Sequence, residues 1–285
     1  MHFIDTHCHL DAAEFCGTQT ALLHAAQRQH VTTIVVPSVA ANNFTAVRAL
    51  AQQHKSCAAA YGIHPLYVAP ATTSDLLTLR EFLRDGEAVA VGEIGLDFYV
   101  ANVDATQQQF FFAEQLKLAR EFDLPVLLHV RKAVDAVLQN LRQHKVRGGI
   151  AHAFNGSRSQ ADALIKLGFK LGFGGAMTHN RALHLRELAA TLPLDSIVLE
   201  TDAPDMPPAF LARGEPNGQA RFPHPNPPPQ AGEGTSDLLR KNLINMPAYL
   251  PRIAQTLADL RGISLAEIAA ATTHNALSVL PLLRR

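Results

Sequence analysis

Apolar segments of two kinds alternate along this chain. The segment 31–36 is a run of mostly β-branched residues, which is typical of a strand buried on both faces. The segment 18–30 instead places Leu22, Ala25 and Ala26 on one face at helical spacing. The same criteria predict strands within 3–10, 31–36, 57–62, 88–93, 125–129, 149–152, 169–173 and 196–200. They predict helices at 18–30, 42–54, 73–84, 104–122, 132–144, 157–167, 180–191, 248–261 and 264–280.

The order of these elements predicts a parallel α/β fold. Eight alternations of strand and helix in one chain favour a closed (β/α)8 TIM barrel. An open doubly wound sheet is the alternative, and it would require a glycine-rich phosphate loop after the first strand. The sequence at 6–9 is Thr-His-Cys-His, which is unlike such a loop.

The segment 214–239 interrupts the alternation. It contains the stretch 223–234, where proline and glycine are too frequent for a packed helix or strand. We interpret 214–239 as a flexible insertion after the eighth strand, within a single domain that spans 1–285. Two C-terminal helices follow, and Ser264 with Glu267 predicts a capping box at the start of the second.

Composition limits the classes of function. The formal net charge is +0, so the protein as a whole does not attract nucleic acid electrostatically. Any binding of nucleic acid must then depend on local contacts or on a metal ion. The three cysteines, Cys8, Cys16 and Cys57, form no C-x-x-C pattern and indicate reduced thiols. No secretory leader or membrane-length apolar run occurs, which predicts a cytoplasmic protein.

Metal-ligating side chains recur at the ends of the predicted strands. His7 and His9 lie two positions apart, so in an extended backbone they project to the same side. The other strand ends offer Glu93, His129, His152 and Asp202. In a barrel these ends converge on one face. Four imidazoles and two carboxylates exceed one tetrahedral zinc site and suit two ions that share a carboxylate.

Several motifs together resemble the TatD family of metal-dependent hydrolases. They are HCHLD at 7–11, GIHP at 62–65, GEIGLD at 92–97, His129, HAFNGS at 152–157, ETDAP at 200–204 and NMP at 245–247. The resemblance implies a (β/α)8 barrel and a divalent-metal-dependent DNase with 3′-to-5′ exonuclease action. It further implies that His7, His9 and Asp202 serve one ion. His129 and His152 would then serve a second ion, with Glu93 bridging both.

Other residues near these motifs are candidates for catalysis and substrate binding. Asp202 is expected to orient the attacking water and carry its proton, beside the bridging Glu93. His64 is expected to contact a phosphate or leaving group, with a core or loop hydrogen bond as the alternative.

Four more residues complete this set. Asn155 and Ser157 stand at a helix N-terminus that suits a phosphate oxygen, although they could simply cap the helix. Glu200 is expected to hydrogen-bond a ligand or make a structural contact, and Asp97 is expected to brace the loop after Glu93.

The chain departs from the family pattern at two places. Ala153 and Asn155 stand where the family commonly has Cys and Ser. Ile244 stands where the family usually has Arg before the Asn of Asn-x-Pro. The missing cation could be replaced by Arg240 or Lys241, and its loss bears on nucleic-acid affinity more than on metal binding.

Three functions fit these observations. The first is a phosphodiesterase that acts on DNA ends, with RNA as a further substrate. The second is a hydrolase of a small amide, lactone or ester at the same two-metal site. The third is a non-catalytic metal-binding protein. Zn²⁺, Mn²⁺ and Mg²⁺ all suit the ligand types, and neither a membrane nor an obligate protein partner is expected.

Overall fold

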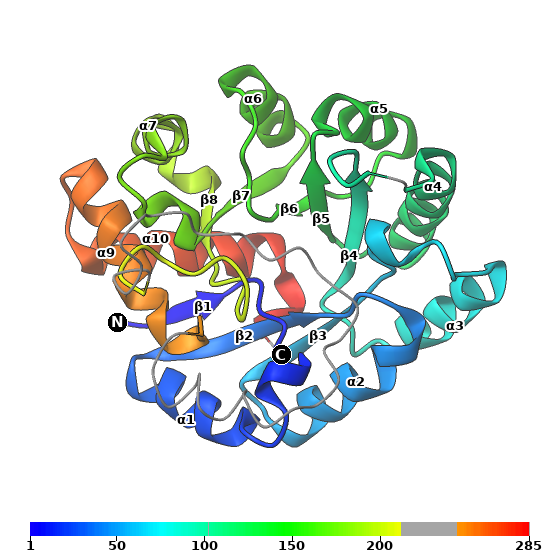
Figure 1. Cartoon of the computed structure of the whole chain (residues 1–285), viewed down its shortest axis with the longest axis horizontal. Coiled ribbons are helices and arrows are strands. Elements are labelled where there is room, and N and C mark those ends of the chain that lie inside the picture. The colour runs from blue at the N-terminus through cyan, green and yellow to red at the C-terminus, as the bar shows by residue number, and fades with distance from the viewer. Residues whose placement is uncertain (102, 212–243, 285) are drawn as a thin grey trace.

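Eight parallel strands form a barrel in the computed structural model, which describes residues 1–101, 103–211 and 244–284 (Figure 1). Each strand pairs with the next one in the sequence. The strands are β1 (Phe3–Asp5), β2 (Val31–Pro37), β3 (Cys57–Tyr61), β4 (Ala90–Asp97), β5 (Val126–Arg131), β6 (Gly149–Ala151), β7 (Phe169–Phe173) and β8 (Ile197–Leu199). Sequential parallel pairing with helical crossovers confirms the predicted TIM barrel.

Hydrogen bonds between the ends of β1 and β8 close the barrel. The amide of Thr6 donates to the carbonyl of Leu199 (3.1 Å), and that of Asp202 donates to the carbonyl of His7 (2.8 Å). The amide of His9 donates to the carbonyl of Ala203 (2.8 Å). These contacts continue past both strands, so the segments that carry His7, His9 and Asp202 run side by side.

Helices surround the barrel and cover one of its ends (Figure 1). They are α1 (Gln19–Arg28), α2 (Phe44–Gln53), α3 (Thr73–Arg84), α4 (Ala105–Glu121), α5 (Val134–His144), α6 (Arg158–Lys166), α7 (Leu183–Thr191), α9 (Leu250–Arg261) and α10 (Leu265–Val279). The expected helix at 42–54 begins instead with a 3₁₀ turn, Ala41–Asn43. The side-chain Oδ1 of Asn43 accepts from the amides of Val39 and Ala40, which stabilises that turn.

Two strands are longer than expected. The prediction ended the fourth strand at Glu93 and the fifth at His129, whereas β4 reaches Asp97 and β5 reaches Arg131. The extension arises because Asp97 pairs with Arg131 in the parallel ladder. Glu93 and His129 therefore lie inside strands, and their backbone is fixed on both sides.

Side-chain caps begin three helices, and the predicted capping box of Ser264 and Glu267 is confirmed. Asp104 Oδ1 accepts from the amides of Thr106 (2.9 Å) and Gln107 (3.1 Å) at the start of α4. Ser157 and Ser264 each cap a helix through a capping box, at α6 and α10 respectively. These hydrogen bonds satisfy amides that have no partner inside the helix.

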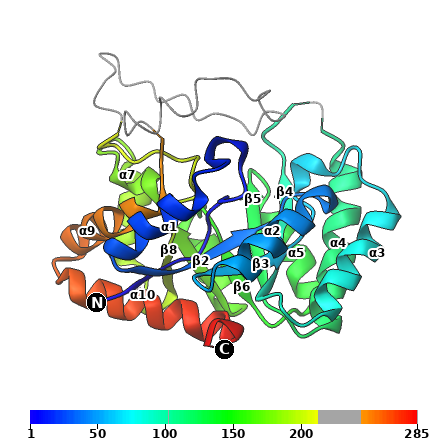
Figure 2. The same ribbon diagram turned by 90° about the horizontal axis from the view of Figure 1, so that it is seen from below.

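Helix α10 closes the end of the barrel opposite the ligand-bearing strand ends. A cluster of buried side chains joins the inside of the barrel to α10: Ile4, Val35, Ala60, Leu127, Ile150 and Val198 meet Ala276 and Val279. Figure 2 shows α10 running along this end, where both chain termini also lie. Apolar side chains therefore fill this end of the barrel, which we call its floor. The candidate metal ligands lie at the opposite end.

The predicted insertion at 214–239 lies outside the described residues. Within 1–101, 103–211 and 244–284, no helix is both long and apolar enough to cross a membrane.

Candidate metal centre

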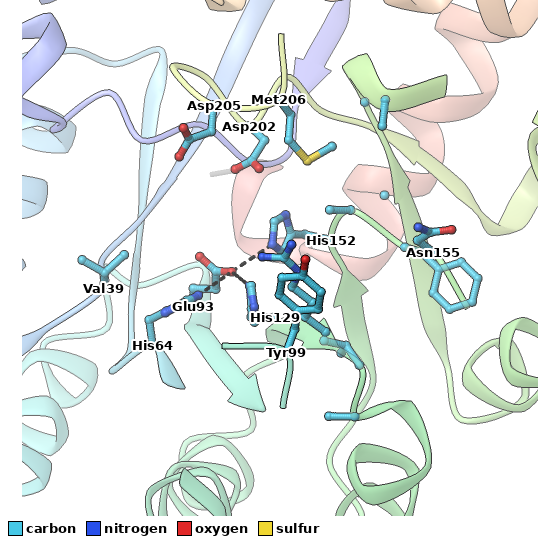
Figure 3. A pocket seen from close by; sticks show the side chains of 18 of the residues that line it. Val39, His64, Glu93, Tyr99, His129, His152, Asn155, Asp202, Asp205 and Met206 are labelled. Carbon is cyan, nitrogen blue, oxygen red and sulfur yellow. Dashed lines mark hydrogen bonds and ion pairs between the residues drawn. The ribbon is translucent and has the colours of Figure 1, made fainter. Parts of the chain in front are cut away.

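The carboxylate of Glu93 lies at the middle of a group of imidazoles (Figure 3). Its Oε2 faces His7 Nε2 (3.2 Å) and His9 Nε2 (3.6 Å). Its Oε1 faces His152 Nε2 (2.9 Å) and His129 Nδ1 (3.0 Å). The two oxygens of one buried carboxylate thus face two different pairs of histidines.

Asp202 completes the side of the cluster that contains His7 and His9. Its Oδ1 lies 3.8 Å from the Nε2 atoms of both histidines, which are 3.3 Å from each other. The Asp202 backbone has a φ of 55°, in the left-handed region that residues other than glycine rarely adopt. Strained backbone of this kind is typical of functional sites, because the surrounding structure must hold it in place.

Asp5 holds the ends of β1 and β8 together beneath these ligands. Its Oδ1 accepts from the Thr201 amide (2.9 Å), and its Oδ2 accepts from the Thr201 hydroxyl (2.5 Å). Its Oδ1 also accepts from the His7 amide at 3.3 Å. Burial raises the pKa of Asp5 to about 7, although these hydrogen bonds act in the opposite direction.

Asp97 orients His129. The Nε2 of His129 donates to Asp97 Oδ2 (3.1 Å), which leaves Nδ1 directed at Glu93. The other oxygen of Asp97 accepts from the amides of Tyr99 (2.9 Å) and Val100 (3.2 Å). Asp97 therefore braces the loop after β4, as expected, and it also fixes the ring of a candidate ligand.

Glu200 lies behind His152. Its Oε1 accepts from the Ala153 amide (2.6 Å) and lies 3.8 Å from His152 Nδ1, too far for a hydrogen bond. Burial raises the pKa of Glu200 to about 8. Gly172 is required beside it, since a Cβ at that position would lie 2.1 Å from Glu200 Oε2.

His64 makes the loop hydrogen bond that was the alternative to substrate contact, yet it also faces the cluster. Its Nδ1 accepts from the Leu66 amide (3.2 Å), and its Nε2 lies 3.6 Å from Glu93 Oε1. In the neutral ring an accepting Nδ1 places the hydrogen on Nε2. His64 therefore presents an N–H donor to the cluster. Burial lowers its pKa well below the usual value, so the ring is neutral.

Burial and the neighbouring charges shift the pKa values of this group in different directions. Burial lowers the pKa of His7 to about 4, which leaves a neutral imidazole with a lone pair. Burial alone would lower the pKa of His152, but the carboxylates of Glu93 and Asp202 raise it to about 10. The nearby imidazoles outweigh burial at Glu93 and hold its pKa well below the usual value.

These side chains fit divalent metal ions. The cluster offers imidazole nitrogens and carboxylate oxygens, which are the ligand types that divalent metals take in proteins. Ligand atoms of three sets lie within 4.8 Å of one another, and the sets are His7–Glu93–His152, His7–His9–Asp202 and His64–Glu93–His129. The structure thus brings together all six residues that the sequence suggested as ligands, and it adds His64 to their neighbourhood.

The cluster opens into a cavity of about 1700 Å³ among the described residues. Asn155 and Ser157 line this cavity, but Asn155 lies apart from Glu93 and the histidines (Figure 3). The Ser157 hydroxyl accepts from the Gln160 amide (3.2 Å) as part of the α6 cap. Both residues are placed on the cavity wall.

Sequence reasoning assigned no role in the site to three residues that shape it. The first is Asp5, which the sequence could have indicated because a carboxylate is unusual inside a predicted buried strand. The second is Arg131, which lines the cavity two positions after His129. The third is Asn245, whose Nδ2 donates to the carbonyls of Thr201 and Asp205 (both 2.7 Å) and ties the loop after β8 to the segment before α9.

Ile244 stands where the TatD family usually has Arg, and its surroundings in the structure suit an apolar side chain. Ile244 is partly buried and packs against the hydrophobic core. Arg240 and Lys241, the suggested replacements for the missing cation, lie outside the described residues.

Comparisons with known proteins agree with this geometry. A family model described as TatD related DNase matches residues 4–281. YjjV of Escherichia coli K12, described as a metal-dependent hydrolase, is 44% identical over 208 residues, or 72% of this chain and 80% of YjjV. The crystal structure of the YjjV protein, described as a TatD homologue, superposes with a TM-score of 0.83 at 37% identity and 98% coverage of both chains.

A further relative carries a more specific description. A protein of Erwinia tasmaniensis described as the 3′-5′ ssDNA/RNA exonuclease TatD is 30% identical over 276 residues, or 95% of this chain and 97% of that protein. The barrel, the cluster around Glu93 and the match over nearly the whole chain lead to one conclusion. This chain belongs to the TatD family and is a metal-dependent hydrolase with a histidine–carboxylate cluster able to bind metal.

Proposed function

We propose that the chain is a phosphodiesterase that removes nucleotides from the 3′ end of DNA, using two divalent metal ions. The observation that carries this proposal is the position of Glu93. Its Oε2 faces His7 and its Oε1 faces His152, so one carboxylate is placed to share two ions. In this assignment His7, His9 and Asp202 hold one ion, while His129 and His152 hold the other.

Two ions at this position would polarise a phosphodiester, lower the pKa of a water molecule and stabilise the leaving oxygen. Asp202 orients the attacking water and accepts its proton, since its carboxylate stands at the edge of the cluster and lines the cavity. The backbone hydrogen bond from its amide to His7 holds Asp202 in this position. Glu93 keeps the two histidine pairs at a fixed spacing.

His64 and the α6 N-terminus contact the substrate in this proposal. The N–H of His64 Nε2 donates to the scissile phosphate or to the leaving oxygen, because the opposite ring nitrogen is engaged by Leu66. Asn155 and Ser157 offer polar groups further along the cavity wall. Asp97 and Glu200 act through the histidines that they face.

The size of the cavity supports a polymeric substrate over a small ester. Pockets for small molecules usually enclose roughly 300–1,000 Å³, whereas this cavity has a volume of about 1700 Å³. The description of the Erwinia tasmaniensis relative as a ssDNA/RNA exonuclease supports nucleic acid. Hydrolysis of a small amide, lactone or ester remains the alternative, because the same ligand set serves both reactions.

A metal-resolved activity screen tests the proposal. Metal-free protein is reloaded with Mg²⁺, Mn²⁺ or Zn²⁺ and given end-labelled single-stranded DNA, RNA and a panel of small esters. We expect stepwise loss of nucleotides from the 3′ end. Asp202→Asn should lower kcat by about 10²–10⁴-fold, the usual contribution of a general base.

The matched control is Asp162→Asn, which removes a carboxylate that pairs with Arg158 on the surface. It should retain full activity. A folded, metal-loaded protein that leaves DNA intact would exclude the nuclease, and turnover of the ester panel in that protein would favour the alternative.

A further inference from the structure

Arg131 is a cation on the wall of the cavity. Its guanidinium carbon lies 3.8 Å from the centre of the Tyr99 ring, and both residues line the cavity. The ion pairs that arginines form among residues 1–101, 103–211 and 244–284 do not include Arg131. Within these residues, the N–H donors of its guanidinium are available to an anion.

The backbone fixes Arg131 relative to the metal centre. Arg131 and His129 are two positions apart in β5, so they project to the same side of the strand. Two residues of a strand span about 6.6 Å, which places Arg131 one step nearer the cavity mouth than His129. The carbonyl of Arg131 accepts from the Phe98 amide (2.9 Å), and Asp97 holds the Tyr99 amide. Asp97 thus holds the backbone of Tyr99, whose ring lies under the guanidinium, and also bonds the ring of His129.

The charged residues divide the cavity into two sides. Asp11, Glu14 and Asp205 line the side formed by the loops after β1 and β8. Arg131 and Lys132 line the side formed by the loop after β5. Asp135, the acidic residue nearest to Arg131 in sequence on that side, accepts a hydrogen bond from Gln160. A polyanion that enters this cavity is attracted to the side of Arg131 and repelled by the other.

We propose that Arg131 binds the phosphate next to the scissile one in a single-stranded nucleic acid. This inference rests on the proposed function and specifies its substrate as an oligonucleotide with at least two phosphates. The planar guanidinium fork matches two phosphate oxygens, and stacking on Tyr99 orients it before the substrate arrives. A neutral amide or lactone has no group that would use this cation.

A binding experiment with a charge-deleted ligand tests this role. The ligand is a labelled thymidine oligonucleotide with hydrolysis-resistant phosphorothioate linkages, bound to metal-loaded protein and followed by fluorescence anisotropy. Arg131→Gln should raise Kd about tenfold, as expected for the loss of a charge-assisted hydrogen bond. It should also reduce the slope of log Kd against log salt concentration by about 0.7, the value for one phosphate contact on a single strand.

Three controls separate this role from a structural one. Arg131→Lys keeps the charge and should keep the salt slope while it weakens binding. Arg48→Gln removes a guanidinium that is also stacked, 3.8 Å above the Phe82 ring, but is paired with Asp85 and lies outside the cavity. That variant should leave both Kd and slope unchanged. Replacement of the flanking phosphate by a neutral methylphosphonate should weaken binding to the unmodified protein, with no further effect in Arg131→Gln.

An unchanged salt slope in Arg131→Gln, or an equal methylphosphonate effect in both proteins, would overturn the inference. The methylphosphonate measurement on the unmodified protein requires no variant, so a folding defect cannot hide the result. Because binding is measured without turnover, the two proposals fail separately. Absence of DNA cleavage contradicts the proposed function, whereas binding that is independent of Arg131 contradicts only this inference.

Discussion

His129 illustrates how single residues set the chemistry of this site. One ring nitrogen of His129 bonds Asp97, and the other faces Glu93. If Nδ1 binds a metal ion, the ring hydrogen lies on Nε2 and is donated to Asp97, because that carboxylate can only accept. The burial of His7 has a similar effect, since a pKa of about 4 keeps that ring neutral at physiological pH. The tautomer and the protonation state of the candidate ligands therefore depend on the side chains around them.

Asp97→Asn should weaken metal binding by about 10–100-fold, the usual effect of losing a carboxylate that orients a ligating histidine. The measurement is a competition titration against a metal-chelating dye. Asp104→Asn is the matched control, because asparagine is as good an N-cap as aspartate and should leave affinity unchanged. Equal metal affinity in Asp97→Asn and the unmodified protein would show that Asp97 serves the loop alone.

At the scale of elements, local hydrogen bonds determine where helices begin. Glu267 Oε2 accepts from the amide (2.9 Å) and hydroxyl (2.7 Å) of Ser264 at the start of α10. These hydrogen bonds lower the pKa of Glu267 below its ordinary value of 4.5. The cap therefore depends on the ionised carboxylate.

This capping box predicts a pH-dependent stability difference. A carboxylate whose folded pKa is depressed stabilises the fold above its unfolded pKa and loses that contribution as pH falls through the folded pKa. Glu267→Gln should therefore be less stable than the unmodified protein at pH 7, and the difference should vanish as pH falls below 4.5. Urea denaturation across this pH range measures it, and a difference independent of pH would contradict the assignment.

At the scale of the whole molecule, the barrel is closed at one end and open at the other. Helix α10 packs its Ala276 against the barrel floor, where Leu127 and Val198 are fully buried. At the opposite end, Asn245 ties the loop that carries Asp202 and Asp205 to the segment before α9. The chain after residue 243 thus stabilises both ends of a barrel whose strands all precede it.

Ala276→Asp should destabilise the protein by about 3–5 kcal/mol, because it places an unpaired charge in the floor of the barrel. Ala270→Asp, at an exposed position of the same helix, should change stability by about 0.5 kcal/mol or less. Thermal and urea denaturation of the two variants make the comparison. Similar losses of stability in both variants would mean that α10 does not pack against the inside of the barrel.

The alternation of apolar segments by itself determined the barrel, and the residue types at the strand ends determined the cluster. His7, His9, Glu93, His129, His152 and Asp202 were all identified in this way, because parallel strands place the residues at their carboxyl ends on one face. Helix caps such as that of Ser264 were equally predictable, since they depend on neighbours three residues away.

Only the tertiary structure decided what orients these ligands and what else faces the cavity. Asp5 and Thr201 are 196 positions apart, and periodicity carries no information on a hydrogen bond of that range. The true lengths of β4 and β5 follow from the pairing of Asp97 with Arg131, which no single segment specifies. That pairing also brings Arg131 onto Tyr99 at the cavity wall, because it sets the end of β5 beside the segment that follows β4.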